Sequence, residues 1–440
     1  MDGLIMTGQL ILGLSILIVL HELGHFLAAR AFGIKVEKFY LFFDAWGVKL
    51  FKFNYKGCEY GIGWLPLGGY VKIAGMIDES MDTEQMEGPP QPHEFRSKPA
   101  WQRLIVMLGG VFVNIVLGIF IFWMITFKYG ETFISNDKLT QGIVPGSIGK
   151  DIGLLVGDKI TEIDGEKIVR FNEILSSKVL MGGVDLTVER NGTTQHIAVP
   201  GDILNAIADS GSNEFVQERI YLNGVKGIQK ESAADKAGFM VGDSILQVAD
   251  QQVVFFDEFQ AVLGKNKGKE LDFLINRKGE EMNLHAKIPE DGIIGIEIAP
   301  NLPFETVKYG FFQSLPIGAS KAWGSLIDNA KGLGKVATGQ VKATKALSGP
   351  VGIAEMFGAE VNWIRFWTLV GLLSMALALM NLLPIPGLDG GHTLFLLIEM
   401  VQGKPMSDKF MERAQLVGFV IIVALMVFVM GNDILKLIQK

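Results

Sequence analysis

The first apolar stretch of the chain carries the feature that most constrains its fold. Residues 4–29 are predominantly apolar and long enough to span a hydrocarbon layer of ~30 Å as one helix. Within them stand His21, Glu22 and His25, in the spacing H-E-x-x-H. A helix puts the two histidines on one face, so both imidazoles can bind one zinc ion, and Glu22 can take a proton from water that the metal activates. The motif therefore predicts a metal site inside a membrane helix.

An alternative interpretation makes the motif a helix end at which two histidines and a glutamate reach the lipid headgroups. Ionisable side chains within a spanning segment cost about 2.5–3.5 kcal/mol each on insertion scales, so they usually mark function. The position of the motif inside the apolar run favours the metal site.

Composition agrees with a membrane protein of several domains. The chain has 440 residues, 49% of them hydrophobic, and its mean hydropathy is +0.32, which is high for a soluble protein. Its length predicts ~2–4 domains. The net charge of −7 gives no indication of nucleic-acid binding, and the single cysteine, Cys58, excludes an internal disulfide framework. The N-terminal run lacks a basic segment and continues into the motif, so it does not resemble a cleaved signal peptide.

Four apolar runs predict four transmembrane helices. They cover residues 4–29, 104–127, 363–383 and 416–430. Lysines and arginines concentrate in residues 30–103, between the first two runs, and the positive-inside rule places that segment in the cytoplasm. Both termini and the long segment between the second and third runs are then expected on the outer face. The H-E-x-x-H motif is expected toward the cytoplasmic end of its helix.

Residues 62–72 form an apolar, glycine-rich segment that is too short to span a membrane. They predict a β-hairpin that dips into the membrane beside the active site, where irregular backbone is tolerated if protein covers it. An ordinary turn between two soluble strands explains the local pattern equally well. As an edge strand the segment could hold a substrate by strand addition, with Gly68 and Gly69 as candidate substrate-binding residues.

The second predicted helix contains Gly109, Gly110 and Asn114. Small residues at this point allow another helix to approach closely. Asn114 is a polar side chain in a membrane helix and needs a partner. A role in helix packing is favoured over a catalytic role.

Residues 131–302 are polar, rich in glycine and internally repeated. Residues 147–160 match residues 232–245, and Gly153 and Gly238 stand 85 positions apart (238 − 153). This period predicts tandem domains rather than a solenoid. Both units resemble PDZ domains of the circularly permuted bacterial kind.

PDZ domains bind an extended peptide as an added strand and often capture its C-terminal carboxylate. The carboxylate loop is expected near residues 292–296 in the second unit and around residues 215–221 in the first. The alternative is that one or both domains are steric spacers that bind no peptide.

A catalytic zinc needs a third protein ligand and an open position, and Asp389 is the best candidate. It follows the third apolar run, among prolines and glycines that keep the backbone irregular. His392 is a rival, but three residues further on it is expected to face away or to donate a hydrogen bond to a ligand. Local sequence alone would make Asp389 an ordinary turn residue before two glycines.

Three motifs in this order resemble the site-2 protease family of intramembrane zinc metalloproteases. They are H-E-x-x-H in the first helix, G-x-x-x-N in the second (Gly110, Asn114), and N-x-x-P-x-P-x-L-D-G from Asn381 to Gly390 at the end of the third. The resemblance covers essentially the whole chain.

The resemblance implies a role for each site residue. Zinc is held by His21, His25 and Asp389, and Glu22 is the general acid and base. Asn381 contacts the substrate backbone. The structural neighbours of the site are Asn114, Pro384 and Pro386.

The resemblance also implies substrates and a location. The cleaved bond lies in the transmembrane helix of a single-pass protein, such as an anti-sigma factor already trimmed by a first protease in a stress response. Remnant signal peptides form a second substrate class. The protein is expected in a bacterial inner membrane, with the active site toward the cytoplasm and the PDZ-like domains in the periplasm as a substrate filter.

The expected fold is an α-helical membrane protein with four transmembrane helices, a membrane-associated β-hairpin and inserted tandem PDZ-like domains of the β-rich α+β class. The expected parts are an N-terminal membrane core (1–129), two PDZ-like domains (130–215 and 216–302), amphipathic surface helices (303–360) and a C-terminal membrane core (361–440). A membrane-anchored scaffold with a vestigial zinc site is a second hypothesis, which the intact Glu22 disfavours. A zinc transporter is a third, but it would need neither Glu22 nor peptide-binding domains.

Overall fold

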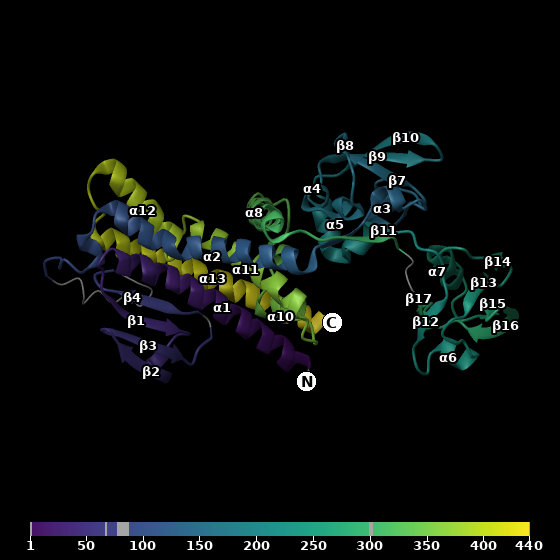
Figure 1. Ribbon diagram of the computed structural model, residues 1–440, viewed down its shortest axis with the longest axis horizontal. Helices are drawn as coiled ribbons and strands as arrows, with labels where there is room; N and C mark the ends of the chain where they lie inside the picture. Colours follow the sequence, from purple (N-terminus) through teal and green to yellow (C-terminus); the bar gives the residue numbers. More distant parts are fainter. Residues whose placement is uncertain (1, 67, 77–87, 299–301, 440) are drawn as a thin grey trace. The chain divides into compact units, whose positions relative to one another are not determined.

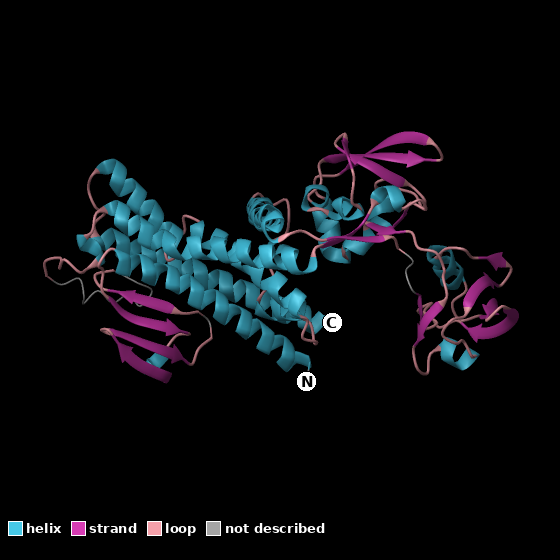
Figure 2. Cartoon of the chain, viewed as in Figure 1, coloured by secondary structure: helices cyan, strands magenta, loops and turns pink. Residues whose placement is uncertain are grey.

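The computed structural model describes residues 2–66, 68–76, 88–298 and 302–439 of the chain. These residues form two compact units. The first unit combines Met1–Gly130 with Lys308–Lys440, and the second is Glu131–Val307. The long helices belong to the first unit, and both units contain β-strands (Figure 2).

The first unit is built on helices that are long and apolar enough to cross a membrane, four of them in the described part of the chain. They are α1 (Asp2–Ala31), α2 (Ala100–Tyr129), α11 (Trp363–Leu382) and α13 (Asp408–Gln439). Each predicted span lies in one of these helices, and only the third prediction runs one residue too far. Figure 1 shows α1 and α2 side by side.

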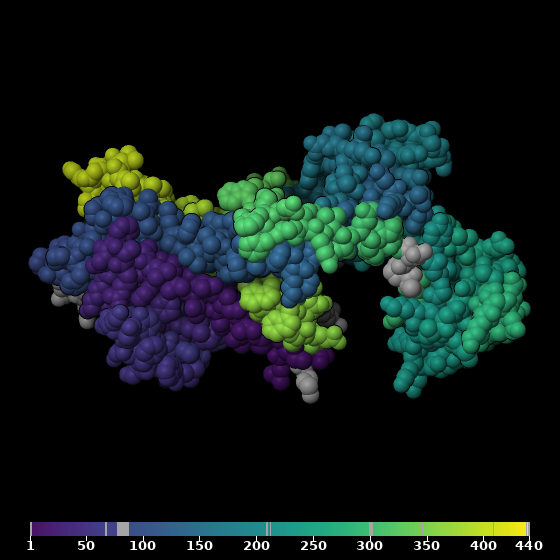
Figure 3. Space-filling view, in the orientation of Figure 1, coloured from purple at the N-terminus to yellow at the C-terminus, as the bar shows by residue number. Residues whose placement is uncertain are grey.

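Glycines bring α1 and α2 into direct backbone contact. A Cβ atom on Gly24 would collide with the carbonyl group of Gly109, and one on Gly109 would lie 2.6 Å from the carbonyl oxygen of Gly24. In the space-filling view, α1 (purple) and α2 (blue) pack directly together (Figure 3). A side chain at either glycine would push the helices apart, so this pair sets their closest approach.

Helices α11 and α8 (Phe311–Ala337) both pack against α2. The hydroxyl of Ser374 in α11 donates to the carbonyl oxygen of Asn114 at 2.7 Å. A Cβ atom on Gly318 of α8 would lie 2.5 Å from the Cα atom of Trp123. Residues 310–347 thus contain α8 and the short α9 (Ala343–Ala346). Their position along a membrane surface stays a prediction.

A buried carboxylate fastens α10 (Pro350–Phe357) to α13. Asp433 of α13 accepts hydrogen bonds from the backbone N–H groups of Gly349, Val351 and Gly352 at 2.9–3.2 Å. The first turn of a helix has no partners of its own for these donors, so Asp433 acts as the cap of α10.

A four-stranded sheet lies beside α1, in the order β2-β3-β1-β4. Its strands are β1 (Val36–Leu41), β2 (Lys49–Tyr55), β3 (Cys58–Gly63) and β4 (Tyr70–Ile73). The predicted hairpin over residues 62–72 is wrong, because β3 and β4 do not pair with each other. Strand β1 lies between them, parallel to β3 and antiparallel to β4. The true hairpin joins β2 and β3, which pair antiparallel up to Tyr55 and Cys58.

The second unit contains two repeats that share their order of elements, except that the first has an additional helix, α5, before its last strand. The first has β6 (Ile143–Pro145), α3 (Ser147–Asp151), β7 (Lys159–Ile163), β8 (Glu166–Lys167), α4 (Ser177–Leu180), β9 (Val184–Arg190), β10 (Thr193–Val199), α5 (Ile203–Ser210) and β11 (Val216–Glu218). The second has β12 (Val225–Ile228), α6 (Ala233–Ala237), β13 (Ser244–Val248), β14 (Gln251–Gln252), α7 (Phe256–Lys265), β15 (Glu270–Arg277), β16 (Glu280–Lys287) and β17 (Ile296–Ile298). The sheets β10-β9-β7-β8 and β16-β15-β13-β14 correspond, as do the pairs β11-β6 and β17-β12.

At two places an expected domain limit separates a strand from the strand with which it pairs. Strand β11 pairs with β6 although it begins at residue 216, where the second domain was expected to start. Strand β18 (Phe304–Val307) pairs with β5 (Glu131–Ile134) and so closes the second unit, although residues 303–360 were expected to be surface helices. Pairing with a distant strand is not visible in the local pattern of a short segment.

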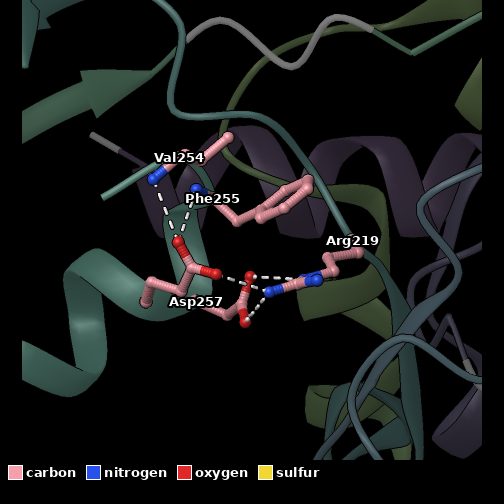
Figure 4. A network of polar contacts seen from close by, with 5 residues as sticks. Arg219, Val254, Phe255 and Asp257 are labelled. Atoms are coloured by element: carbon pink, nitrogen blue, oxygen red, sulfur yellow. Dashed lines mark hydrogen bonds and ion pairs between the residues drawn. The ribbon is translucent and has the colours of Figure 1, made fainter. Parts of the chain in front are cut away.

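The segment that joins the first repeat to the second is held by backbone hydrogen bonds and is not a flexible linker. The backbone N–H of Arg219 donates to the carbonyl of Gly142, and residues 220–222 then pair with the backbone around Phe255. The guanidinium of Arg219 lies 3.7 Å from the centroid of the Phe255 ring and forms an ion pair with Asp257 (Figure 4). Backbone pairing and the arginine contacts together hold this junction in place.

Each repeat holds the same buried ion pair. Asp243 accepts hydrogen bonds from Nε and Nη2 of Arg277, both at 2.7 Å, and Asp158 is paired in the same way with Arg190. Each arginine also donates to the carbonyl of the glycine that follows the helix, Gly238 in the second repeat. The pair therefore ties the two central strands to the helix end, and it is part of what the sequence repeat encodes.

Replacing Asp243 with asparagine is expected to destabilise the second repeat by roughly 3–5 kcal/mol, the usual cost of breaking a buried ion pair. The Asp243 side chain is 0% exposed, so water cannot reach the carboxylate end of the pair, although the Arg277 side chain is 20% exposed. Hydrogen exchange of the full chain should speed up in β13 and β15 and stay unchanged in β7 and β9. Equal exchange in both repeats would contradict the prediction.

The same pair makes stability depend on pH. Burial alone would raise the pKa of Asp243, but the bonds from Arg277 and from the Met240 N–H outweigh it and hold the pKa below its ordinary value. The stabilisation is therefore complete above the ordinary aspartate pKa and is lost as the pH falls through the lowered pKa.

Candidate metal centre

Three side chains from opposite ends of the chain converge in the first unit. His21 and His25 lie one turn apart on α1, and their Nε2 atoms are 3.2 Å apart. Oδ2 of Asp389, the first residue of α12 (Asp389–Gln402), lies 3.2 Å from each of these nitrogens. The exposed fractions of the side chains of His21, His25 and Asp389 are 9%, 8% and 16%.

The donor atoms fit a zinc ion. Two imidazoles and one carboxylate are a donor set of catalytic zinc sites, and a tetrahedral ion with bonds of ~2.0–2.2 Å holds its ligand atoms about 3.3–3.6 Å apart. Oδ2 of Asp389 is buried and has no hydrogen-bond partner among the described residues, and an ion would supply one. His21, His25 and Asp389 form the group of potential metal-binding side chains found in the described part of the chain.

The loop after α11 brings Asp389 to the histidines. Gly387 has a φ of +91°, which favours glycine, and the loop then folds back on itself. A Cβ atom on Gly390 would collide with the carbonyl of Leu383, and one on Gly391 would lie 2.5 Å from the carbonyl oxygen of Ile385. The glycines of the motif are therefore required by close backbone approach around the start of α12.

The two prolines of this loop have different surroundings. Pro386 packs against α13, because a Cβ atom on Gly418 would collide with its carbonyl group. Pro384 is exposed and stands in the loop between α11 and α12. Neither proline belongs to the group of side chains that could hold the metal.

Helix α2 presents its backbone and Asn114 to the two histidines. Nδ1 of His25 donates to the carbonyl oxygen of Val106 at 2.8 Å, and Nδ1 of His21 lies 3.0 Å from the amide nitrogen of the fully buried Asn114. Gly110 lies midway between Val106 and Asn114 along α2. A Cβ atom there would be 2.7 Å from Nδ1 of His21 and closer still to Nε2 of His25. Only glycine leaves room for the two imidazoles.

Glu22 lies between the metal ligands and the sheet. The backbone of Val71 in β4 lies close to its carboxylate. Strand β4 stands at the edge of its sheet, and Gly69, just before it, allows close approach to α1, because a Cβ atom there would lie 2.6 Å from Cγ2 of Ile18. Gly68 packs instead against Phe43, because a Cβ atom on Gly68 would lie 2.7 Å from the aromatic ring. The carboxylate and the strand edge therefore lie next to each other.

Two further residues that the sequence singled out, Asn381 and His392, differ in their distance from the donor group. The amide nitrogen of Asn381, in the last turn of α11, lies 3.2 Å from Nε2 of His21. His392 is not in the donor group, because its Nε2 contacts the side-chain amide of Gln415 at 3.0 Å. Sequence reasoning missed Val106 and Val71, which act through backbone atoms that no residue type reveals.

Comparison with known proteins agrees with this geometry. The model of peptidase family M50 matches residues 9–425. The regulator of sigma-E protease RseP of Escherichia coli K12 is 32% identical, over 97% of this chain and 98% of its own length. The regulator of sigma E protease of Haemophilus influenzae is 30% identical over 98% of both chains. These matches confirm the resemblance to the site-2 proteases, and with three side chains that could hold a metal set among apolar helices the chain belongs to peptidase family M50.

Proposed function

We propose that this protein is a zinc metalloprotease that hydrolyses peptide bonds within the transmembrane segments of single-pass membrane proteins. The observation that carries the proposal is the position of the donor atoms. His21, His25 and Asp389 meet among helices that are long and apolar enough to cross a membrane. A site at that depth suits a substrate that is itself a membrane helix.

The residues around the donor group have distinct tasks in hydrolysis. Zinc held there supplies Lewis acidity, which polarises the scissile carbonyl and lowers the pKa of a water molecule. Glu22 takes the proton of the attacking water and passes it to the leaving amine. Asn381 lies 3.2 Å from His21 at the same site, and its amide can hydrogen-bond the substrate backbone.

Strand β4 is the best place to hold the substrate. A helix hides its peptide bonds within its own hydrogen bonds, so the substrate must unwind before water can attack. The outer edge of β4 lies beside Glu22 and can pair with the unwound segment by strand addition. Gly68 and Gly69 let the segment before this edge pack closely against Phe43 and Ile18, and we propose that they help to hold the substrate there.

The outer surface of the sheet supports its contact with lipid. Leu50, Phe51 and Phe53 of β2 have exposed fractions of 68%, 57% and 50%. Large apolar side chains gathered on one strand mark an interaction surface rather than ordinary solvent exposure. The sheet then lies in the membrane beside the active site, with the exposed apolar side chains of β2 toward the lipid.

The substrates that we propose are anti-sigma factors already trimmed by a first protease, and remnant signal peptides. The names of the relatives, regulators of sigma-E protease, support the first class. The two repeats of the second unit act as PDZ-like domains that admit only substrates with small outer parts. The protein lies in a bacterial inner membrane, with the donor group toward the cytoplasm and the repeats in the periplasm.

The test is cleavage of one model transmembrane segment, carrying either a short outer tail or a large folded outer domain, in reconstituted membranes. The short form should be cut and the long form spared. A zinc chelator should stop the cleavage, and added zinc should restore it. If the protein retains zinc but cuts neither form, it is a scaffold rather than a protease. If it cuts both equally, the repeats do not filter substrates.

A further inference from the structure

We propose that Asn114 is a positioning residue of the metal centre, and that its side-chain oxygen accepts the Nδ1 proton of His21. The inference goes beyond the hydrolysis proposed above. It rests on the metal site of that proposal, but its test measures metal retention and not cleavage.

His25 shows the hydrogen bond that an imidazole needs in order to bind a metal through Nε2. Its Nδ1 contacts the carbonyl oxygen of Val106 at 2.8 Å. A carbonyl oxygen can only accept a hydrogen bond, so Nδ1 of His25 carries the proton. Nε2 then keeps its lone pair and faces Oδ2 of Asp389, as a metal ligand must.

His21 faces the same carboxylate oxygen through its Nε2, at the same distance of 3.2 Å. If this nitrogen is also a ligand, the proton of His21 must sit on Nδ1 and must have an acceptor. The side-chain amide of Asn114 lies 3.0 Å from Nδ1 of His21. Nδ1 therefore has its acceptor only if the oxygen of this amide faces it.

The amide of Asn114 can provide that oxygen. Its two ends are nearly identical in shape, and which end is oxygen is decided by the hydrogen bonds around it. Oδ1 of Asn114 is buried and has no hydrogen-bond partner among the described residues. Exchanging the two ends puts Oδ1 against Nδ1 of His21 and turns an orphan oxygen into an acceptor.

Helix α2 places these partners at regular intervals. Val106, Gly110 and Asn114 are spaced four residues apart, so they share one face of α2. His21 and His25 face that stripe from α1. One helix thus supplies an acceptor for each imidazole and a gap between them, which is more than the role in helix packing that the sequence suggested.

Two substitutions at Asn114 and one beside it test the proposal. Asn114→Leu keeps the branched shape of the side chain but removes the acceptor, and Asn114→Asp keeps an acceptor oxygen. The matched control is Ser374→Ala, which removes the bond to the backbone oxygen of Asn114 and leaves its side chain alone. Zinc retention against a chelator is measured on the purified full chain, together with its thermal unfolding.

The leucine variant is expected to bind zinc about 10–100-fold more weakly, the usual effect of losing such a partner. The aspartate variant and Ser374→Ala should retain zinc nearly as the unaltered protein does. Wild-type retention in the leucine variant would overturn the proposal, and so would equal loss in the leucine and aspartate variants. If the leucine variant does not fold, Asn114→Ala replaces it with the same expectation. None of these results depends on whether the protein cuts a substrate.

Discussion

Glu22→Gln is expected to abolish hydrolysis while zinc stays bound. Glutamine has the same shape but cannot take a proton from water, and general acid–base catalysis contributes about 10²–10⁴-fold to rate. Glu22 is not among the three donor side chains, so its neutralisation leaves the donor group intact. Cleavage of a short single-span substrate and zinc content should both be measured on the same preparation.

A conservative variant separates loss of the proton acceptor from loss of shape. Glu22→Asp keeps a carboxylate but shortens its reach, so a small part of the activity should return. Loss of zinc in the glutamine variant would give Glu22 a ligand role instead. Cleavage at more than about a tenth of the normal rate would rule out Glu22 as the essential base.

Gly110→Ala is expected to destroy both zinc binding and cleavage. The added Cβ atom would lie 2.7 Å from Nδ1 of His21 and closer to Nε2 of His25. Neither imidazole can move away, because the contacts of its Nδ1 to α2 hold it in place. Zinc affinity should fall by on the order of 100-fold or more, since the displaced donors cannot meet on one ion.

Gly118→Ala is the matched control for this substitution. It makes the same change on the same helix, two turns further along, where the Cβ atom would meet Sδ and Cγ of the unbranched Met375 side chain rather than an imidazole. That side chain can shift, so the control variant should retain zinc and cut substrate. Zinc content by metal analysis and thermal unfolding on both variants distinguish a blocked metal site from a disrupted helix pair. Normal zinc content in Gly110→Ala would contradict the packing argument.

The helices and the donor group could be predicted because their signals are local and strong. Long apolar runs predicted the four described helices that are long and apolar enough to cross a membrane, and the H-E-x-x-H spacing placed His21 and His25 on one face of α1. The structure brings Asp389 to them, as the order of the three motifs implied. In each case the residue type itself carries the property that matters, either hydrophobicity or a metal-binding atom.

The sheet could not be predicted, because strand partners depend on contacts far apart in the sequence. Residues 62–72 suggested a hairpin, but β1 lies between β3 and β4. Helix α12 was missed for a similar reason, since the prolines and glycines before it indicated only irregular backbone. The acceptor for His25 is the backbone oxygen of Val106, which any residue at that position would provide.

The donor group joins the two ends of the chain, and this has a consequence during synthesis. His21 and His25 emerge from the ribosome well before Asp389, which follows His25 by 364 positions (389 − 25). Until Asp389 has emerged, the growing chain has only two of the three side chains that could hold the metal. We expect the nascent protein to be unable to hold a catalytic ion, so that it cannot damage its neighbours in the membrane before it is complete.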